Sequence, residues 1–185
     1  VTFRAAGDMF SRGLAHAAKE LGVQFDWVLW DHYALASRVA YFDPDILLVI
    51  HGRDFTTRWG NGFNYLRLHR ALWLVDEPYE VDDTSRYSKY FDTVFIQDPS
   101  TLDRHENAHY LPVCYDPSRH FDAGRERIYK AGFVGANNKT RLKHLTAAAR
   151  KGYLSYLVGG PWVGPSVLKH LSLGVYLHPS EVAEM

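Results

Sequence analysis

A glycine turn followed by basic residues is the part of this chain whose residue types most directly suggest chemistry. Residues 132–141 read GFVGANNKTR, an apolar run that leads through a glycine into the expected start of a helix. The first turn of a helix carries unpaired N–H groups and partial positive charge, so Lys139 and Arg141 are unfavourable there unless an anion binds. Together with Gly135 and Asn138 they predict a phosphate-binding turn; the alternative is that both cations simply face solvent.

Polar residues at the ends of apolar runs form a second group of candidates. They are Asp8, His51, Asp76 with Glu77, and Asp98. In an open parallel sheet, ligands bind beyond the carboxyl ends of the strands, so we expect these residues at one edge. A base that removes a proton from a hydroxyl group must be a carboxylate or an imidazole, which makes Asp8, His51, Asp76 and Glu77 the catalytic candidates. The alternatives are helix capping or pairing with arginine for the two adjacent acids, and a hydrogen-bonded strand end for His51.

Three further features have weaker signals. Arg12 is expected early in the first helix, where it would contact an anion or face solvent. Gly160 follows an expected strand, and the turn that it forms either approaches a ligand or is closed by a packed Trp162. His105 and His109 have a spacing that can bind metal on a helix, but a helix end is expected between them. The sequence therefore predicts no metal site.

Short apolar runs alternate with helical patterns along the chain, which predicts an α/β fold with parallel sheets. The expected strands are residues 1–5, 24–30, 46–52, 71–75, 93–96, 109–113, 128–134 and 154–158. The expected helices follow Ser11, cover residues 33–42, lie near Leu66, run from Thr84 or Ser85 to Tyr90, and cover residues 99–106 and 138–151. Residues 122–127 have the composition of a linker, after which the pattern starts again. We therefore expect two Rossmann-like domains, residues 1–122 and 123–185, the second of them truncated.

Composition limits the classes of partner. The formal net charge is zero and 46% of the residues are hydrophobic, which is typical of a folded domain and gives no general attraction to nucleic acid. Cys114 is the single cysteine, so a disulfide framework is excluded. No membrane-spanning or secretory segment is visible in the sequence. These features predict a cytoplasmic protein without an integral membrane segment.

Three segments of the first expected domain resemble a known enzyme family. Residues 71–80 (ALWLVDEPYE), 90–98 (YFDTVFIQD) and 111–121 (LPVCYDPSRHF) are similar to glycosyltransferases of the GT-B type, and more narrowly to CgeB-like spore-maturation glycosyltransferases. The FVG at residues 133–135, with the basic helix start after it, is similar to the opening of the second domain in that family. The resemblance covers nearly the whole chain. The family's donor-binding glutamate region would lie beyond Met185, so we expect this chain alone to be inactive.

The resemblance implies metal-independent transfer of a sugar from a nucleotide-sugar donor to a hydroxyl group of a sugar, protein or small molecule, with no other cofactor. The donor would contact Gly135, Asn138, Lys139, Arg141 and Gly160, and the acceptor would lie on the side of Arg12 and Asp98. One alternative is a noncatalytic binding or scaffold module with the same architecture. A single flavodoxin-like or receiver-like domain is disfavoured by the restart near Gly124. The donor sugar, the stereochemistry and the oligomeric state are not fixed by the sequence.

Overall fold

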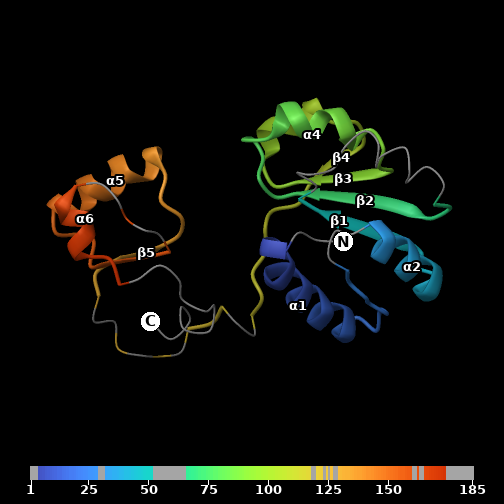
Figure 1. Cartoon of the computed structure of the whole chain (residues 1–185), viewed down its shortest axis with the longest axis horizontal. Helices are drawn as coiled ribbons and strands as arrows, with labels where there is room; N and C mark the ends of the chain where they lie inside the picture. The colour runs from blue at the N-terminus through green and yellow to red at the C-terminus, as the bar shows by residue number, and fades with distance from the viewer. Residues whose placement is uncertain are drawn as a thin grey trace. The chain divides into compact units, whose positions relative to one another are not determined.

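The chain forms two compact units, Val1–Tyr115 and Asp116–Met185 (Figure 1). The computed structural model describes residues 4–28, 32–51, 66–117, 120–122, 124, 126, 129–159, 162 and 165–173. Each unit contains a parallel sheet with helices packed against it, so the predicted α/β fold with Rossmann-like parallel sheets is confirmed. The division between the units falls inside residues 111–121, earlier than the boundary expected after residue 122.

The first unit is built on a four-stranded sheet in the order β1-β2-β3-β4, with every pair parallel. Its strands are β1 (Ile46–Ile50), β2 (His69–Leu74), β3 (Thr93–Ile96) and β4 (Ala108–Tyr110). In register, Ile50 lies opposite Trp73 and Leu74 lies opposite Ile96, so the first three strands end at the same edge. Strands that are covered on both faces have continuous apolar sequences, so these strands could be predicted from the sequence.

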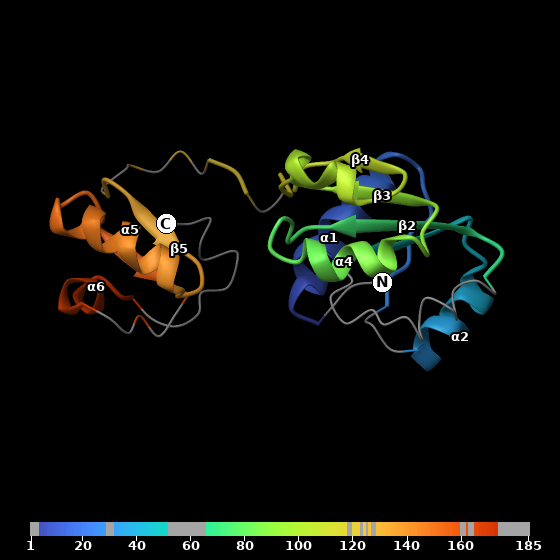
Figure 2. The same cartoon turned by 90° about the horizontal axis from the view of Figure 1, so that it is seen from above.

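Helices cover both faces of this sheet. They are α1 (Arg4–Glu20), α2 (His32–Phe42), α4 (Val81–Ser88) and the 3-10 helix η1 (Pro99–Arg104). Helices α1 and α4 lie on opposite sides of the sheet, as the two perpendicular views show (Figures 1 and 2). From α1, the ring of Phe10 meets Trp73 of β2 edge-on, with the ring centroids 5.2 Å apart. From the other side, Tyr87 of α4 joins the buried cluster of Leu72 and Val94.

Three expectations for the first unit are wrong. Helix α1 starts at Arg4, so residues 4 and 5 belong to a helix and not to a first strand. Phe10, Leu14 and Ala18 have helical spacing, and this spacing continues back through Gly7. A glycine inside a helix costs about 1 kcal/mol, which is less than the free energy gained by packing the aromatic ring of Phe10. Residues 23–28 form no strand. Residues 66–68 are not helical, and the other residues near the helix expected at Leu66 lie partly outside the described part of the chain. Helix α4 begins at Val81, before the expected caps, and places Asp82 and Asp83 in its favourable first turn.

The second unit contains a parallel strand–helix–strand unit, as the sequence predicts. Strands β5 (Gly132–Val134) and β6 (Tyr156–Val158) pair in parallel and are connected by α5 (Lys139–Arg150). A short helix that the sequence did not predict, α6 (Ser166–His170), follows. Its Leu168 is fully buried together with Leu157 and Trp162, which explains how a short helix is held. Trp162 is thus packed in a core, which agrees with the alternative in which a packed Trp162 closes the turn at Gly160.

None of the helices in the described part of the chain is both long and apolar enough to cross a lipid bilayer. The longest of them, α1, carries charged residues along its length, including Arg12 and Lys19. This finding agrees with the absence of a spanning segment from the sequence pattern, and it concerns only the residues that the structure describes.

An ion pair fixes the start of β2 to the turn before β3. The Arg70 guanidinium donates to both carboxylate oxygens of Asp92, at 2.7 and 3.0 Å, and the Arg70 backbone N–H donates to Oδ2 at 2.8 Å. The hydrogen bonds from Arg70 lower the pKa of Asp92 to about 2. In return, the Asp92 backbone N–H donates to the Arg70 carbonyl at 2.8 Å. Side chain and backbone together therefore join the two strands at the amino edge of the sheet.

We expect Asp92→Asn to lower the free energy of unfolding at pH 7 by about 1 kcal/mol, because solvent screens a pair that is partly exposed. The pKa of Asp92 is lower in the folded chain than in the unfolded chain. The stabilisation is therefore complete above about pH 4 and is lost as the pH falls toward 2. Urea unfolding of the unsubstituted protein and of the Asp92 variant between pH 2 and pH 7 measures the difference in the free energy of unfolding. Asp103→Asn, at an exposed position, is the control, and a difference that does not change with pH would contradict the assignment.

Candidate functional site

The carboxyl edge of the first sheet collects most of the candidates that the sequence singled out. His51 follows β1, Asp76 follows β2, and Asp98 follows β3, and parallel pairing brings these positions to one edge as predicted. Asp8 lies within α1, so the expectation that it follows a strand is wrong, and its catalytic role stays a prediction. Arg12 is exposed in the middle of the same helix, so the expectation that it lies near a helix start is also wrong.

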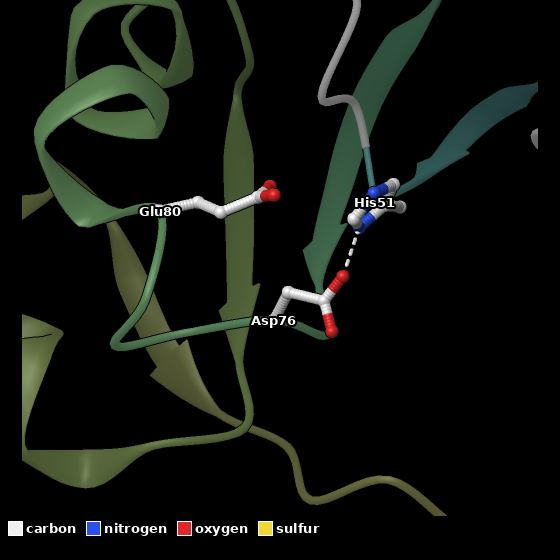
Figure 3. Close-up of side chains that lie close together, drawn as sticks. All are labelled: His51, Asp76 and Glu80. Carbon is white, nitrogen blue, oxygen red and sulfur yellow. Dashed lines mark ion pairs between the residues drawn. The ribbon is translucent and has the colours of Figure 1, made fainter. Parts of the chain in front are cut away.

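His51 and Asp76 form a close polar pair at this edge. His51 Nδ1 lies 3.0 Å from Asp76 Oδ2, and the side chains are 13% and 55% exposed (Figure 3). His51 has a φ of 70°, a conformation that residues other than glycine rarely adopt. Its backbone N–H still donates to the Trp73 carbonyl at 2.7 Å, and the Tyr87 hydroxyl donates to its carbonyl at 3.4 Å. These bonds hold the imidazole in place at the end of β1.

Glu80 completes a cluster that the sequence analysis missed. One ligand atom from each of His51, Asp76 and Glu80 lies within 4.8 Å of the other two. Figure 3 shows the Glu80 carboxylate directed toward the other two side chains. The turn at residues 77–80 closes with a hydrogen bond from the Tyr79 N–H to the Asp76 carbonyl at 3.0 Å. The acidic residues on both sides of Pro78 were the signal in the sequence. Only the folded turn shows that Glu80 comes close to Asp76 and His51.

Glu77 is directed into the interior and not toward the edge. It is only 2% exposed, and one of its oxygens accepts a hydrogen bond from the Thr84 hydroxyl. The same oxygen lies 3.5 Å from His105 Nε2, and His105 Nδ1 lies 3.0 Å from the Ser88 hydroxyl. Glu77 therefore forms a buried polar network beneath α4. This placement removes it from the groups that can accept a proton from a hydroxyl at the surface, and His105 is part of the same network.

Asp98 has a structural task. Its side chain caps η1 by accepting a hydrogen bond from the Ser100 backbone N–H at 2.9 Å, and this bond lowers the pKa of the carboxyl group. The neighbouring Gln97 donates from its side chain to the Glu77 carbonyl at 3.0 Å. These contacts explain the polar residues after β3 without a ligand. The acceptor-side role expected for Asp98 stays a prediction.

Two glycine turns of the second unit contact each other through their backbones. The Gly135 N–H donates to the Val158 carbonyl at 2.9 Å, which continues the β5–β6 ladder past the end of β5. Gly159 has a φ of 97°, and a Cβ atom built there would lie 2.9 Å from the Gly135 oxygen. The contact therefore requires glycine at position 159. Gly160, which was expected to contact a donor, lies outside the described residues.

The start of α5 is basic, as predicted. Asn138 caps the helix by accepting a hydrogen bond from the Arg141 N–H at 2.8 Å, and the first turn contains no acidic residue. The Arg141 guanidinium donates to the Ala136 carbonyl at 2.9 Å and lies over the Phe133 ring, 5.8 Å from its centroid. In the described ranges, neither Lys139 nor Arg141 is paired with a carboxylate of the chain. The positive charge at this helix start is thus not neutralised from within those ranges.

Comparison of the chain with models of protein families, and with curated proteins, finds no match. The resemblance to CgeB-like glycosyltransferases therefore stays a prediction. Two places carry the candidate chemistry: the His51–Asp76–Glu80 cluster in the first unit and the basic helix start in the second. A functional interpretation depends on the geometry of these residues.

We expect Gly159→Ala to destabilise the second unit by about 2–3 kcal/mol, because the new Cβ adds a backbone clash to an unfavourable φ. Gly152→Ala is the matched control: its φ is also positive, at 69°, but no atom lies within 4 Å of the added carbon. This control should cost only about 1 kcal/mol. Hydrogen exchange of the β6 amides reports on this unit directly. Equal effects of the two substitutions would show that the glycine turns do not contact each other.

Proposed function

We propose that the protein is a glycosyltransferase that transfers a sugar from a nucleotide-sugar donor to a hydroxyl group, without a metal ion in the transfer step. One observation carries the proposal: the start of α5 presents basic side chains and unpaired backbone donors beside a glycine turn. Within the described part of the chain, the N–H groups of Lys139 and Thr140 make no hydrogen bond. Such a helix start favours the binding of a phosphate group.

Arg141 is suited to the diphosphate of the donor. A guanidinium group has five N–H donors, and the bond to the Ala136 carbonyl accounts for one of them. That bond and the Phe133 ring hold the group beside the turn, so it needs little reorganisation when negative charge develops on the leaving diphosphate. A Cβ on Gly135 would lie 3.0 Å from the Phe133 ring and 3.6 Å from Arg141 Nη1. Glycine at this position therefore avoids a close contact with the Phe133 ring, over which the guanidinium lies.

His51 is the proposed base. With Nδ1–H donated to Asp76, the lone pair on Nε2 accepts the proton of the acceptor hydroxyl, and Asp76 stabilises the imidazolium that forms. The acceptor oxygen then forms a bond to the anomeric carbon. The bond from that carbon to the phosphate oxygen breaks, and its electron pair leaves with the nucleoside diphosphate. Glu77 takes no part, because it is buried in the network beneath α4.

A noncatalytic binding or scaffold module is the second candidate. The observation in its favour is that Arg141 already contacts Ala136 and Phe133, which is sufficient to order the helix start without a ligand. Such a module would keep this geometry and would bind no nucleotide sugar. Donor binding therefore distinguishes the two functions.

We expect Arg141→Ala to weaken binding of the donor about 10-fold or more, since a charge-assisted hydrogen bond contributes roughly 1.5–3 kcal/mol. Isothermal titration of the full-length protein with a panel of UDP-, GDP- and TDP-sugars measures the affinity. Arg150→Ala is the matched control, because it removes the same charge from the last turn of the same helix. Unchanged affinity in the Arg141 variant would remove the donor site from α5. No binding of any donor by the unsubstituted protein would favour the scaffold.

We expect His51→Gln to lower kcat by roughly 100-fold to 10,000-fold, the range typical of a lost general base, and to leave donor affinity unchanged. Glutamine retains hydrogen-bonding capacity toward Asp76 but cannot take up the proton. The rate at which the full-length protein releases nucleoside diphosphate in the presence of an acceptor panel is the readout. His109→Gln, on β4 and exposed, is the control. A variant with full turnover would show that another group takes the proton.

A further inference from the structure

We propose that the His51–Asp76–Glu80 cluster is a binding site for one divalent transition-metal ion. Its three side chains come from two adjacent connections at the carboxyl edge of the sheet, the residue after β1 and the turn before α4. Their nearest ligand atoms lie within 4.8 Å of one another, and His51 Nδ1 and Asp76 Oδ2 are 3.0 Å apart. Small rotations of the two carboxylates would bring all three atoms to a common ion.

Charge favours a cation at this position. Two carboxylates converge on one imidazole, and like charges at short separation repel each other unless an opposite charge lies between them. A bound divalent ion would make an attractive contact with the carboxylates of both Asp76 and Glu80. The charges of the cluster and the positions of its ligand atoms therefore both favour a bound cation.

The chemistry of the donors selects the class of ion. One imidazole nitrogen with two carboxylate oxygens suits Zn²⁺, Mn²⁺, Co²⁺ or Fe²⁺. Ca²⁺ and Mg²⁺ prefer sites made entirely of oxygen, so a histidine ligand disfavours them. Three ligands from the protein also leave coordination positions for water or for an anionic group of a ligand.

Bonds outside the cluster hold the backbone of His51, and the side chain of Glu80 is directed toward the cluster. His51 is fixed by its positive φ, by its N–H bond to the Trp73 carbonyl, and by the hydroxyl of Tyr87 on its own carbonyl. Glu80 occupies the N-cap position of α4, yet its side chain forms no capping hydrogen bond with that helix. Its carboxylate extends toward Asp76 and His51 instead, as Figure 3 shows. The site therefore combines a nitrogen ligand whose backbone is fixed at the end of β1 with two carboxylates from the turn before α4.

This inference goes beyond the proposed function and does not depend on it. Coordination of the ion by Nδ1 moves the imidazole proton to Nε2, so the ring has no lone pair left for a hydroxyl proton. Metal binding and the use of His51 as a base would then exclude each other. Under the proposed function, the rate of sugar transfer would then depend on the concentration of the ion.

Direct metal titration tests the site. The protein, freed of metal with a chelator, is titrated with Co²⁺ and followed by visible absorption, and with Zn²⁺ by calorimetry. We expect one ion per chain, with weaker binding of Mg²⁺ and Ca²⁺. Glu80→Gln and His51→Gln should each weaken Co²⁺ binding about 10-fold or more, by analogy with the loss of groups that support a metal site. Glu106→Gln, which removes an exposed carboxylate outside the cluster, should bind as the unsubstituted protein does.

Two outcomes would overturn the proposal. One is a folded protein that binds no Co²⁺ or Zn²⁺, and the other is equal affinity in the Glu80, His51 and Glu106 variants, which would place the ion elsewhere. Circular dichroism establishes that each variant is folded, and donor titration of the same samples separates this inference from the proposed function. A protein that binds the donor but no metal ion would reject only the metal proposal. Metal binding without donor binding would reject only the glycosyltransferase.

Discussion

Parallel pairing of β1, β2 and β3 is the constraint on which the chemistry of the first unit depends. Because Ile50 lies opposite Trp73 and Leu74 lies opposite Ile96, the residues after these strands share one edge. A histidine and an aspartate that are 25 positions apart in the sequence thereby come within 3.0 Å of each other. The opposite edge is joined by the Arg70–Asp92 pair. One edge of the sheet is thus fixed by an internal ion pair, while the other carries the His51–Asp76–Glu80 cluster.

The second unit uses a different device, the close approach of two glycine turns. Contact between the backbones at Gly135 and Gly159 continues the ladder of β5 and β6 to the point where α5 begins. The helix start is thereby positioned by the backbone, and its basic side chains need not pair with carboxylates to be held. Arg141 contributes to the order of the turn through Ala136 and Phe133. A turn that is ordered in this way can bind an anion without a large loss of conformational entropy.

Elements with strong local signals could be predicted from the sequence. The run at residues 46–50, the strand at residues 93–96 and the helix capped by Asn138 all follow from apolar continuity or capping chemistry. The first strand was wrong because an apolar start at residues 1–5 does not distinguish a short strand from the first turn of a helix. Neighbouring acids posed a different problem: Asp76 faces the edge and Glu77 the interior, and only tertiary packing decides between them. Glu80 was missed for the same reason, since its approach to His51 depends on the turn at Pro78.

The central claim is that an anion of the donor binds at the first turn of α5. An NMR titration of the ¹⁵N-labelled protein with a nucleoside diphosphate tests it most directly, because each backbone amide reports on its own surroundings. The account predicts large shifts at the Lys139 and Thr140 amides and small ones at Arg150, at the far end of the helix. Nucleotide binding that leaves the first two amides unshifted, or no binding at all, would contradict it.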